Sequence, residues 1–286
     1  MERTTSSKQQ RNHGCGIHNS LSMAPVIDVI RHAESTHNIS GNAYERDPDL
    51  TAHGEWQAYF LGKTYPFMNK ISHVVSSPMR RAIRTALIAF ERVLLEGKKA
   101  ILLPELQETG IQPSDMGQPP DALEVVFRPQ IDTSLLDRKW FLKSQDSKYI
   151  PDVALVEARA REARVFLREL AQSGPDDAHI VVVSHGGFLH FLTESYSCLT
   201  EGHFTTYNNT TVQSFQFVDL YGTDPDAKMI ETKENCKRLN LGPFMKMSDE
   251  EKKLCKSYAV ARIEAQKRDF EKATSSNRPP VQTHVF

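Results

Sequence analysis

Short apolar runs alternate with helical patterns along most of the chain. Five runs rich in β-branched residues are typical of strands, and the first four are almost continuously apolar, as in strands buried on both faces. They lie at residues 26–30, 72–77, 100–104, 179–185 and 211–220. Strands that alternate with helices indicate βαβ units. We therefore predict an α/β fold, a three-layer sandwich in which a mostly parallel central sheet has helices on both faces.

Helical patterns fill the intervals between these runs. Residues 51–64 have a helix-like composition, and residues 79–96 have an amphipathic stripe. In residues 152–172 apolar side chains recur at intervals of three and four, which predicts a helix with one face toward the core. Ser77 and Pro78 fit the N-cap and the first position of the helix that begins near residue 79.

The composition divides the chain into three parts. Residues 1–22 are polar and are expected to be disordered. Residues 23–222 contain the predicted strands and form the main domain. Within it, residues 109–150 carry several large apolar side chains and form either a cap over a pocket or an ordinary packed subdomain. Residues 223–286 are a charged C-terminal extension.

One long helix is predicted in the C-terminal extension. Ser248 and Glu251 have the spacing of a capping box at its start. Two interpretations stay open, a helix packed on the outside of the domain and a helix that binds a partner. A loose tail is expected over residues 274–286.

Composition narrows the class of protein. A net charge of −1 gives no global attraction to nucleic acid or to an anionic membrane. No apolar run approaches the ~20 residues of a membrane span, and the N-terminal residues lack the apolar core of a signal peptide. Four scattered cysteines without a CxxC motif indicate free thiols in a reducing compartment. We expect a cytoplasmic protein that binds neither nucleic acid nor membrane, with the nucleus left open.

The first strand leads directly into the polar stretch RHAESTHN, residues 31–38. His32 and Glu34 form an H-x-E triplet like that of zinc deaminases, but the P-C-x-x-C partner of that site is absent. His32 and His37 are five residues apart, which does not fit H-E-x-x-H. A metal site is therefore not predicted. The chain also has no P-loop and no dinucleotide fingerprint, so no other cofactor is predicted. What remains is the guanidinium of Arg31 and an imidazole at the edge of the sheet where α/β proteins bind ligands.

Three arginines crowd the start of the second predicted helix, in SSPMRRAIRTA. Cations near a helix N-terminus are opposed by the macrodipole, and so at least one of them is expected to serve an anion. A solvated surface suits Arg80 and Arg84. Arg81 is the functional candidate.

A fourth strand ends in Ser184-His185-Gly186-Gly187 and leads into an apolar helix. Small residues let a ligand approach the backbone, and the helix N-terminus favours an anion. Val182 occupies the place of the first glycine of G-x-S-x-G, so a Ser184 nucleophile is not expected. His190, inside the apolar helix, is interpreted as a core residue.

Carboxylates follow the third strand, within residues 103–119. Glu105, Glu108 and Asp115 are candidates for a general acid. On its own this signal is weak, because loops after strands are commonly acidic.

A parallel sheet would bring these strand ends to one edge. Arg31, His32, Arg81 and His185, with Asn38, then describe a site for a dianionic phosphate, since guanidinium groups donate paired hydrogen bonds to phosphate oxygens. One imidazole can attack phosphorus, a step that depends on positioning and charge neutralisation.

The combination resembles the histidine phosphatase superfamily, the phosphoglycerate-mutase-like proteins. The resemblance rests on RHAESTHN, LTAHGEWQA, SSPMRRAIRTA and SHGG, which occur in the family's order across about residues 26–220. It implies that residues 23–222 are a catalytic domain in which His32 is the phosphorylated nucleophile. It also implies that Arg31, Arg81 and His185 bind the phosphoryl group and that Asn38 supplies a further phosphate contact.

The family places its acid after the strand that follows the arginine block, and Glu108 is our choice. Glu105 and Asp115 are alternatives, because LQETGIQPSDMG departs from the Glu-x-x-x-Gly pattern of the mutases. The sequence thus predicts a metal-independent phosphatase that hydrolyses a small phosphomonoester through a phosphohistidine on His32. The alternatives are a phosphomutase or diphosphate phosphatase of a specialised pathway, and a weakly active member with a binding or regulatory role.

Overall fold

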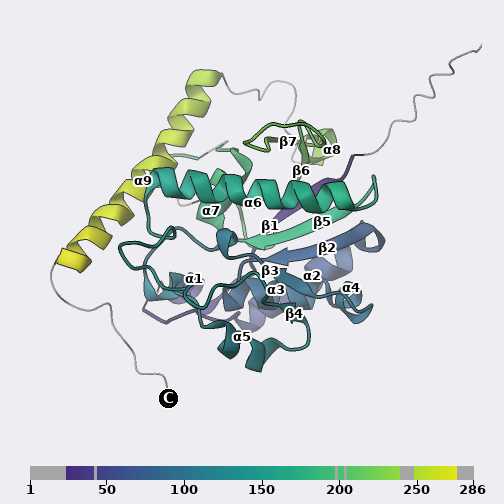
Figure 1. Ribbon diagram of the computed structural model, residues 1–286, viewed down its shortest axis with the longest axis horizontal. Coiled ribbons are helices and arrows are strands. Elements are labelled where there is room, and N and C mark those ends of the chain that lie inside the picture. Colours follow the sequence, from purple (N-terminus) through teal and green to yellow (C-terminus); the bar gives the residue numbers. More distant parts are fainter. Residues whose placement is uncertain (1–23, 42–43, 197–198, 203–204, 239–247, 276–286) are drawn as a thin grey trace, which may run out of the picture.

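A computed structural model describes residues 24–41, 44–196, 199–202, 205–238 and 248–275 of the 286-residue chain (Figure 1). The segment predicted to be disordered, residues 1–22, and nearly all of the predicted tail lie outside the described residues.

A seven-stranded sheet has the order β4-β3-β2-β5-β1-β6-β7. Strands β4, β3, β2, β5 and β1 are parallel neighbours, whereas β6 and β7 run antiparallel at one edge. The bounds of the strands are β1 Val26–Arg31, β2 Ile71–Ser76, β3 Ala100–Leu102, β4 Ile131–Asp132, β5 His179–Ser184, β6 Val212–Phe217 and β7 Met229–Glu231. The predicted mostly parallel α/β sandwich is confirmed.

Helices cover both faces of this sheet (Figure 1). Their bounds are α1 Thr36–Ser40, α2 Ala52–Thr64, α3 Arg80–Ala89, α4 Glu91–Leu95, α5 Pro120–Phe127, α6 Val153–Ser173, α7 Gly186–Thr193, α8 Lys233–Arg238 and α9 Asp249–Ser275. Short 3-10 turns lie at η1 Met68–Lys70, η2 Pro104–Leu106 and η3 Pro113–Asp115. The predicted helix over residues 79–96 is two helices, because the helical pattern is interrupted at Phe90.

Two hydrophobic clusters lie on opposite faces of the sheet. Ile27 and Val29 of β1 pack with α6, α7 and the buried side chains of α9. The next residue along, Ile30, turns to the other face and packs with α2, α3 and α4. The same alternation along β5 explains why its run is apolar without a break, since every residue meets a helix layer.

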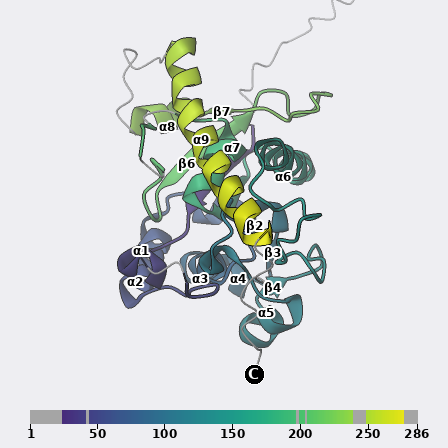
Figure 2. The same cartoon turned by 90° about the vertical axis from the view of Figure 1, so that its left-hand side faces the viewer.

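The described residues of the C-terminal extension, 223–238 and 248–275, pack on the domain. Strand β7 pairs with β6, and α9 buries Cys255, Ala259 and Ile263 in the same cluster as α6 and α7. The predicted capping box is confirmed, because the Ser248 backbone N–H donates to Glu251 (2.7 Å) and the Glu251 N–H donates to Ser248 Oγ (3.2 Å). Figure 2 shows α9, in yellow, crossing the front of the molecule.

Candidate active site

A cavity of about 480 Å³ lies at the carboxyl ends of the parallel strands. Segments far apart in the sequence contribute its lining, from β1 to α9. The lining residues are Arg31, His32, His37, Asn38, Arg81, Glu108, Gln112, Ser114, Asp115, Thr205, Arg262 and Gln266.

The register of β1 and β5 brings the two predicted histidines together. Arg31 lies opposite Ser184 in the parallel ladder, and the His32 N–H continues it by donating to the Ser184 carbonyl (2.9 Å). Each histidine directly follows one member of this pair, and the two rings lie 5.1 Å apart between centroids. Both side chains are buried.

The hydrogen bonds of His32 determine which ring nitrogen faces the cavity. Its Nδ1 lies 2.7 Å from the Ala33 carbonyl, which can only accept, so Nδ1 carries the proton. Nε2 therefore has the lone pair, and the Arg81 Nε–H donates to it at 3.3 Å. Burial lowers the pKa of His32 well below its ordinary 6.5, and the charges of Arg81 and Arg31 lower it further. The imidazole is thus neutral, the form that a nucleophile requires.

Arg81 and Arg31 present guanidinium groups to the same cavity. Arg81 is buried, and its Nη1 donates to the Ser114 carbonyl (2.7 Å). Arg31 donates from Nη1 to the Tyr207 carbonyl (2.9 Å). These backbone contacts fix both cations without neutralising them, which favours an anion in the cavity.

The other two arginines of the second block lie outside the cavity. Arg80 pairs with Asp49 (2.7 Å), and Arg84 pairs with Asp49 and with Glu55 (2.9 Å). The predicted N-cap at Ser77 is wrong, because α3 begins at Arg80 with Met79 as its N-cap. The Ser77 hydroxyl instead lies 2.8 Å from His185 Nε2.

His185 stands at the N-cap of α7. Its Nε2 is engaged by Ser77, whereas Nδ1 is buried and has no hydrogen-bond partner among the described residues. Burial lowers the pKa of His185 well below its ordinary value, and the Arg81 charge adds to this effect. His190, further along α7, is a buried residue held by the Ser195 carbonyl (2.8 Å) and by Thr205 Oγ1 (3.1 Å).

Of the three candidate acids, Glu108 is the most deeply buried in the cavity wall. The Thr109 N–H donates to its Oε1 (2.9 Å), and the Gly187 N–H donates to its Oε2 (3.1 Å). Burial alone would raise the pKa of Glu108. The charge of Arg262, the two N–H donors and the charge of Arg81 outweigh burial and hold the pKa below its ordinary value.

Asp115 also faces the cavity, whereas Glu105 does not. Asp115 lies 3.5 Å from Arg81 Nη2, and burial raises its pKa against the charges of Lys143 and Arg81. Glu105 pairs with Lys148 at 2.8 Å. The geometry therefore leaves two of the three carboxylates next to the predicted nucleophile.

The remaining polar residues of the first block, residues 34–38, differ in whether they line the cavity. His37 and Asn38 line the cavity, and burial lowers the pKa of His37 to about 3. The side-chain Oδ1 of Asn38 accepts from the Ser35 N–H (3.0 Å). Glu34 accepts from Thr51 (2.7 Å) and contributes no side chain to the cavity lining.

Several lining residues were missed by sequence reasoning. Gln112 lies directly before η3 and Ser114 lies within it, and Thr205 lies in a loop after α7. Arg262 and Gln266 come from α9, four residues apart and hence on one face of the helix. Their spacing was the available signal, but nothing in a charged helix says where that face docks.

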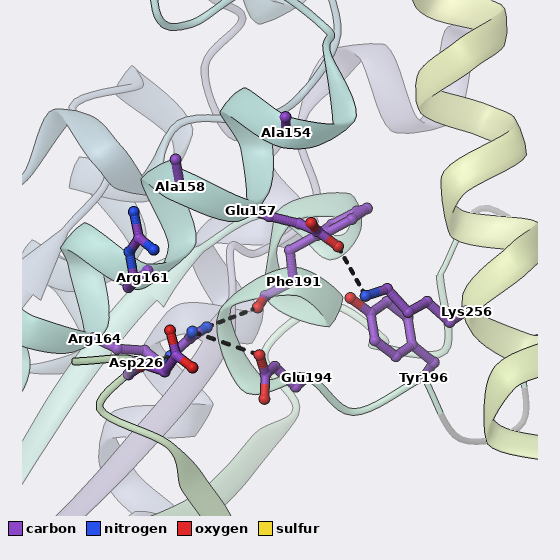
Figure 3. A pocket seen from close by; sticks show the side chains of 10 residues that line it. All are labelled: Ala154, Glu157, Ala158, Arg161, Arg164, Phe191, Glu194, Tyr196, Asp226 and Lys256. Carbon is purple, nitrogen blue, oxygen red and sulfur yellow. Dashed lines mark hydrogen bonds and ion pairs between the residues drawn. The ribbon is translucent and has the colours of Figure 1, made fainter. Parts of the chain in front are cut away.

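A second hollow lies between α6, α7 and α9 (Figure 3). Four of its charged side chains form ion pairs, Glu157 with Lys256 (2.8 Å) and Arg164 with Glu194 (3.5 Å). Among the described residues, no three His, Cys, Asp or Glu side chains are grouped as ligands of a metal ion would be. In the same residues, no helix is long and apolar enough to cross a membrane.

Comparisons with known proteins agree on one family. Residues 27–230 match the histidine phosphatase superfamily (branch 1). A probable phosphatase of Schizosaccharomyces pombe is 33% identical over 167 residues, 57% of this chain and 54% of that protein. This chain therefore spans about half the length of that relative. A phosphoglycerate mutase-like protein of Arabidopsis thaliana is 26% identical over 65% of this chain and 79% of its own length.

Solved structures give a weaker likeness. YhfR of Bacillus stearothermophilus has a TM-score of 0.48 and 18% identity, covering 74% of this chain and 97% of its own.

Proposed function

The chain belongs to the histidine phosphatase superfamily (branch 1), and from this premise we propose that it is a metal-independent phosphatase that hydrolyses a small phosphomonoester through a phosphohistidine on His32. One observation carries the proposal. The unprotonated Nε2 of a neutral His32 lies beside the Arg81 Nε–H in a cavity that Arg31 also lines, and the ring of the second buried histidine, His185, lies 5.1 Å from the His32 ring between centroids.

In the first step the phosphoryl group of the substrate lies between Arg31, Arg81 and His185. Nε2 of His32 attacks phosphorus, and the bond from phosphorus to the leaving oxygen breaks. The arginines stabilise the charge on the equatorial oxygens, and the Nδ1–H of His32 keeps its bond to the Ala33 carbonyl as the ring becomes positive.

Glu108 protonates the leaving oxygen in this step. The carboxyl is ionised in the ligand-free protein, because its pKa is held below the ordinary value. A phosphate dianion bound beside it raises the pKa, since like charges disfavour ionisation. The carboxylate therefore takes up a proton when substrate binds and passes it to the departing alcohol.

In the second step Glu108, now ionised again, accepts a proton from water. The oxygen of that water attacks phosphorus, the phosphorus–nitrogen bond breaks, and Nε2 regains its lone pair as inorganic phosphate leaves. The segment of residues 109–150 contributes Gln112, Ser114 and Asp115 to the cavity wall, and we propose that it selects the leaving group.

A phosphorylated-metabolite screen in the presence of EDTA tests the proposal. We expect the wild type to release phosphate from at least one monoester and His32→Ala to lose about 10³-fold or more of kcat/KM, as for removal of a covalent nucleophile. His53→Ala is the matched control, because His53 is exposed on α2. Substantial turnover by His32→Ala would exclude the assigned nucleophile.

Trapping the intermediate tests the chemistry directly. Wild type denatured at alkaline pH during turnover of a ³²P-labelled monoester should carry label on His32, and acid should release it. Label on a serine would exclude the phosphohistidine. Transfer to a second substrate hydroxyl in place of water would indicate a phosphomutase.

A further inference from the structure

Helix α9 forms one wall of the cavity although it lies beyond the region that matches the family, residues 27–230. Arg262 and Gln266 project from one face of this helix into the lining. The catalytic roles proposed above use neither residue. Their position in the lining indicates that this C-terminal helix contributes to the site.

Contacts along its length fix α9 in place. Lys256 pairs with Glu157 of α6 (2.8 Å), as Figure 3 shows, and Lys267 pairs with Asp152 at the start of α6 (2.7 Å). Between these two pairs, Ala259 and Ile263 are buried in the main hydrophobic cluster. Arg262 therefore reaches the cavity from a helix that is anchored on both sides of it.

The Arg262 guanidinium lies close to the carboxylate of Glu108. A Cβ atom built on Gly187 would lie 2.7 Å from Glu108 Oε1 and 2.8 Å from Arg262 Nη1, so both groups pack against this one glycine. The Gly187 N–H also donates to Glu108 Oε2. Only a residue without a side chain leaves room here for the carboxylate and the cation together.

A second contact ties α9 to the acid. The Thr109 hydroxyl donates to Gln266 Oε1 (3.2 Å), and the Thr109 N–H donates to Glu108 Oε1. One turn of α9 thus touches Glu108 through charge and touches its neighbour through a hydrogen bond. The same helical face carries both interactions.

We propose that Arg262 is a positioning residue of the active site, which holds the Glu108 carboxylate against Gly187 and favours its ionised form, so that α9 is an integral part of the catalytic unit. The proposal rests on the role of Glu108 in the proposed function. The charge of Arg262 is the largest of the influences that lower the pKa of Glu108, ahead of the N–H donors of Thr109 and Gly187.

Other ionisable groups act on Glu108 or feel its charge, from every element around it. The cations are Arg31 of β1, Arg81 of α3, Lys143 of the loop after β4 and Arg159 of α6. The other groups are Asp115 of η3, His37 of α1 and His190 of α7. All of these groups stay in place when only Arg262 is changed, and so a difference between variants isolates the α9 cation.

A titration that needs no turnover tests the ionisation. The Glu108 carboxyl is followed by ¹³C NMR in glutamate-labelled protein and assigned with Glu108→Gln. In Arg262→Met we expect the midpoint to move to higher pH, because burial remains while the compensating charge is gone. Arg262→Lys keeps a charge and should stay nearer the wild type. Arg268→Met, a matched change at an exposed position of α9, should leave the midpoint unchanged.

A pair of substrates tests whether Arg262 acts through the acid. An alkyl phosphate depends on protonation of its leaving oxygen far more than p-nitrophenyl phosphate does, since the nitrophenolate leaves readily. Arg262→Met leaves more of Glu108 protonated but no longer holds its carboxyl in place. It should therefore lower kcat/KM for the alkyl ester about tenfold more than for the aryl ester, and Arg262→Lys should recover part of the loss. Thermal melting of each variant checks that α9 remains docked.

The outcomes separate this inference from the proposed function. An unchanged Glu108 midpoint, or equal losses on the two esters, would overturn the role of Arg262 even if the wild type is an active phosphatase. A loss confined to substrates with a second anionic group, seen mainly in KM, would also overturn it and assign Arg262 to substrate binding. Wild type without turnover would refute the function, while the titration would still report on the contact.

Discussion

Strands β1 and β5 carry buried ionisable side chains at both of their ends. At the amino-terminal end, the carboxylate of Asp28 accepts from His179 Nδ1 (2.6 Å) and from the hydroxyls of Tyr65 and Ser214. Asp28 is completely buried. Each of these polar groups is engaged by another protein group, as buried polarity normally is.

The carboxyl ends of the same strands are arranged differently. His32 lines a cavity of about 480 Å³ and its Nε2 accepts only a long bond from the Arg81 Nε–H (3.3 Å), and His185 leaves its Nδ1 without a hydrogen-bond partner among the described residues. Within the described part of the chain, Arg31 and Arg81 each donate only one hydrogen bond to a backbone carbonyl, from Nη1, so other N–H groups of each guanidinium remain for an anion. A buried histidine is thus present at both ends of these strands. Only the carboxyl ends combine unused hydrogen-bonding capacity with a cavity, as a binding site requires.

The sharpest test of this contrast uses two glutamates three residues apart. Glu108 faces the cavity, whereas Glu105 pairs with Lys148. We expect Glu108→Gln to lower kcat by about 10²- to 10⁴-fold, because the proposed general acid is lost without a change in shape. Glu105→Gln should retain kcat.

The same assay includes the remaining candidate acid. If Asp115→Asn rather than Glu108→Gln abolishes activity, then the acid is Asp115 and the assignment made here is wrong. Steady-state kinetics with an alkyl phosphate measures all three variants under one condition.

A second test compares a histidine substitution at each end of β5. His185→Ala should lower kcat/KM by about 10²- to 10³-fold, as for loss of one group that stabilises the transition state. His179→Ala should retain kcat/KM but lower the free energy of unfolding by about 1–3 kcal/mol, because the buried Asp28 carboxylate loses a donor. Urea unfolding and kinetics on both variants give the comparison. A loss of activity in His179→Ala would show that the two ends are coupled.

Strand ends were the part of the site that the sequence could predict. A run of apolar residues that stops at Arg31 and His32, or at His185, marks both the strand and the edge at which it ends, since parallel strands end together. Very short strands escaped this reasoning, because the two residues of β4 and the three of β7 are too few to show a period.

Residues that reach the site by tertiary packing were harder to predict. Arg262 lies on a helix rich in charges, and its role follows from the docking of Ala259 and Ile263 on α6 and α7. Ser77 had the signature of an N-cap, but α3 begins at Arg80 and the Ser77 hydroxyl lies 2.8 Å from His185 Nε2. In both cases a distant segment, invisible to a local pattern, decides the outcome.

The smallest expected effect concerns pH and stability. Burial holds the pKa of His185 well below 6.5 in the folded protein. As the pH falls through about 6.5, His185 therefore becomes protonated in the unfolded chain but stays neutral in the folded protein. The stability contributed by the neutral ring is fully present above that pH and is lost on acidification, at up to about 1.4 kcal/mol per pH unit. His185→Asn removes this contribution. The difference in unfolding free energy between wild type and variant should therefore be constant above about pH 7 and fall with this slope below about pH 6.

Other buried groups contribute to stability with the opposite pH dependence, and so the difference in unfolding free energy between wild type and variant has to be measured. Burial raises the pKa of Asp47 to about 7, which makes the folded state bind a proton that the unfolded chain has released. This contribution is lost as the pH rises and opposes that of His185 in the wild type, but it is common to both proteins and cancels in their difference. Urea unfolding at pH 8, 7, 6 and 5 supplies the values, with the exposed His53→Asn as control. A difference that does not change with pH would mean that the His185 ring titrates in the folded protein as it does in the unfolded chain, and the expected neutral His185 would have to be abandoned below about pH 6.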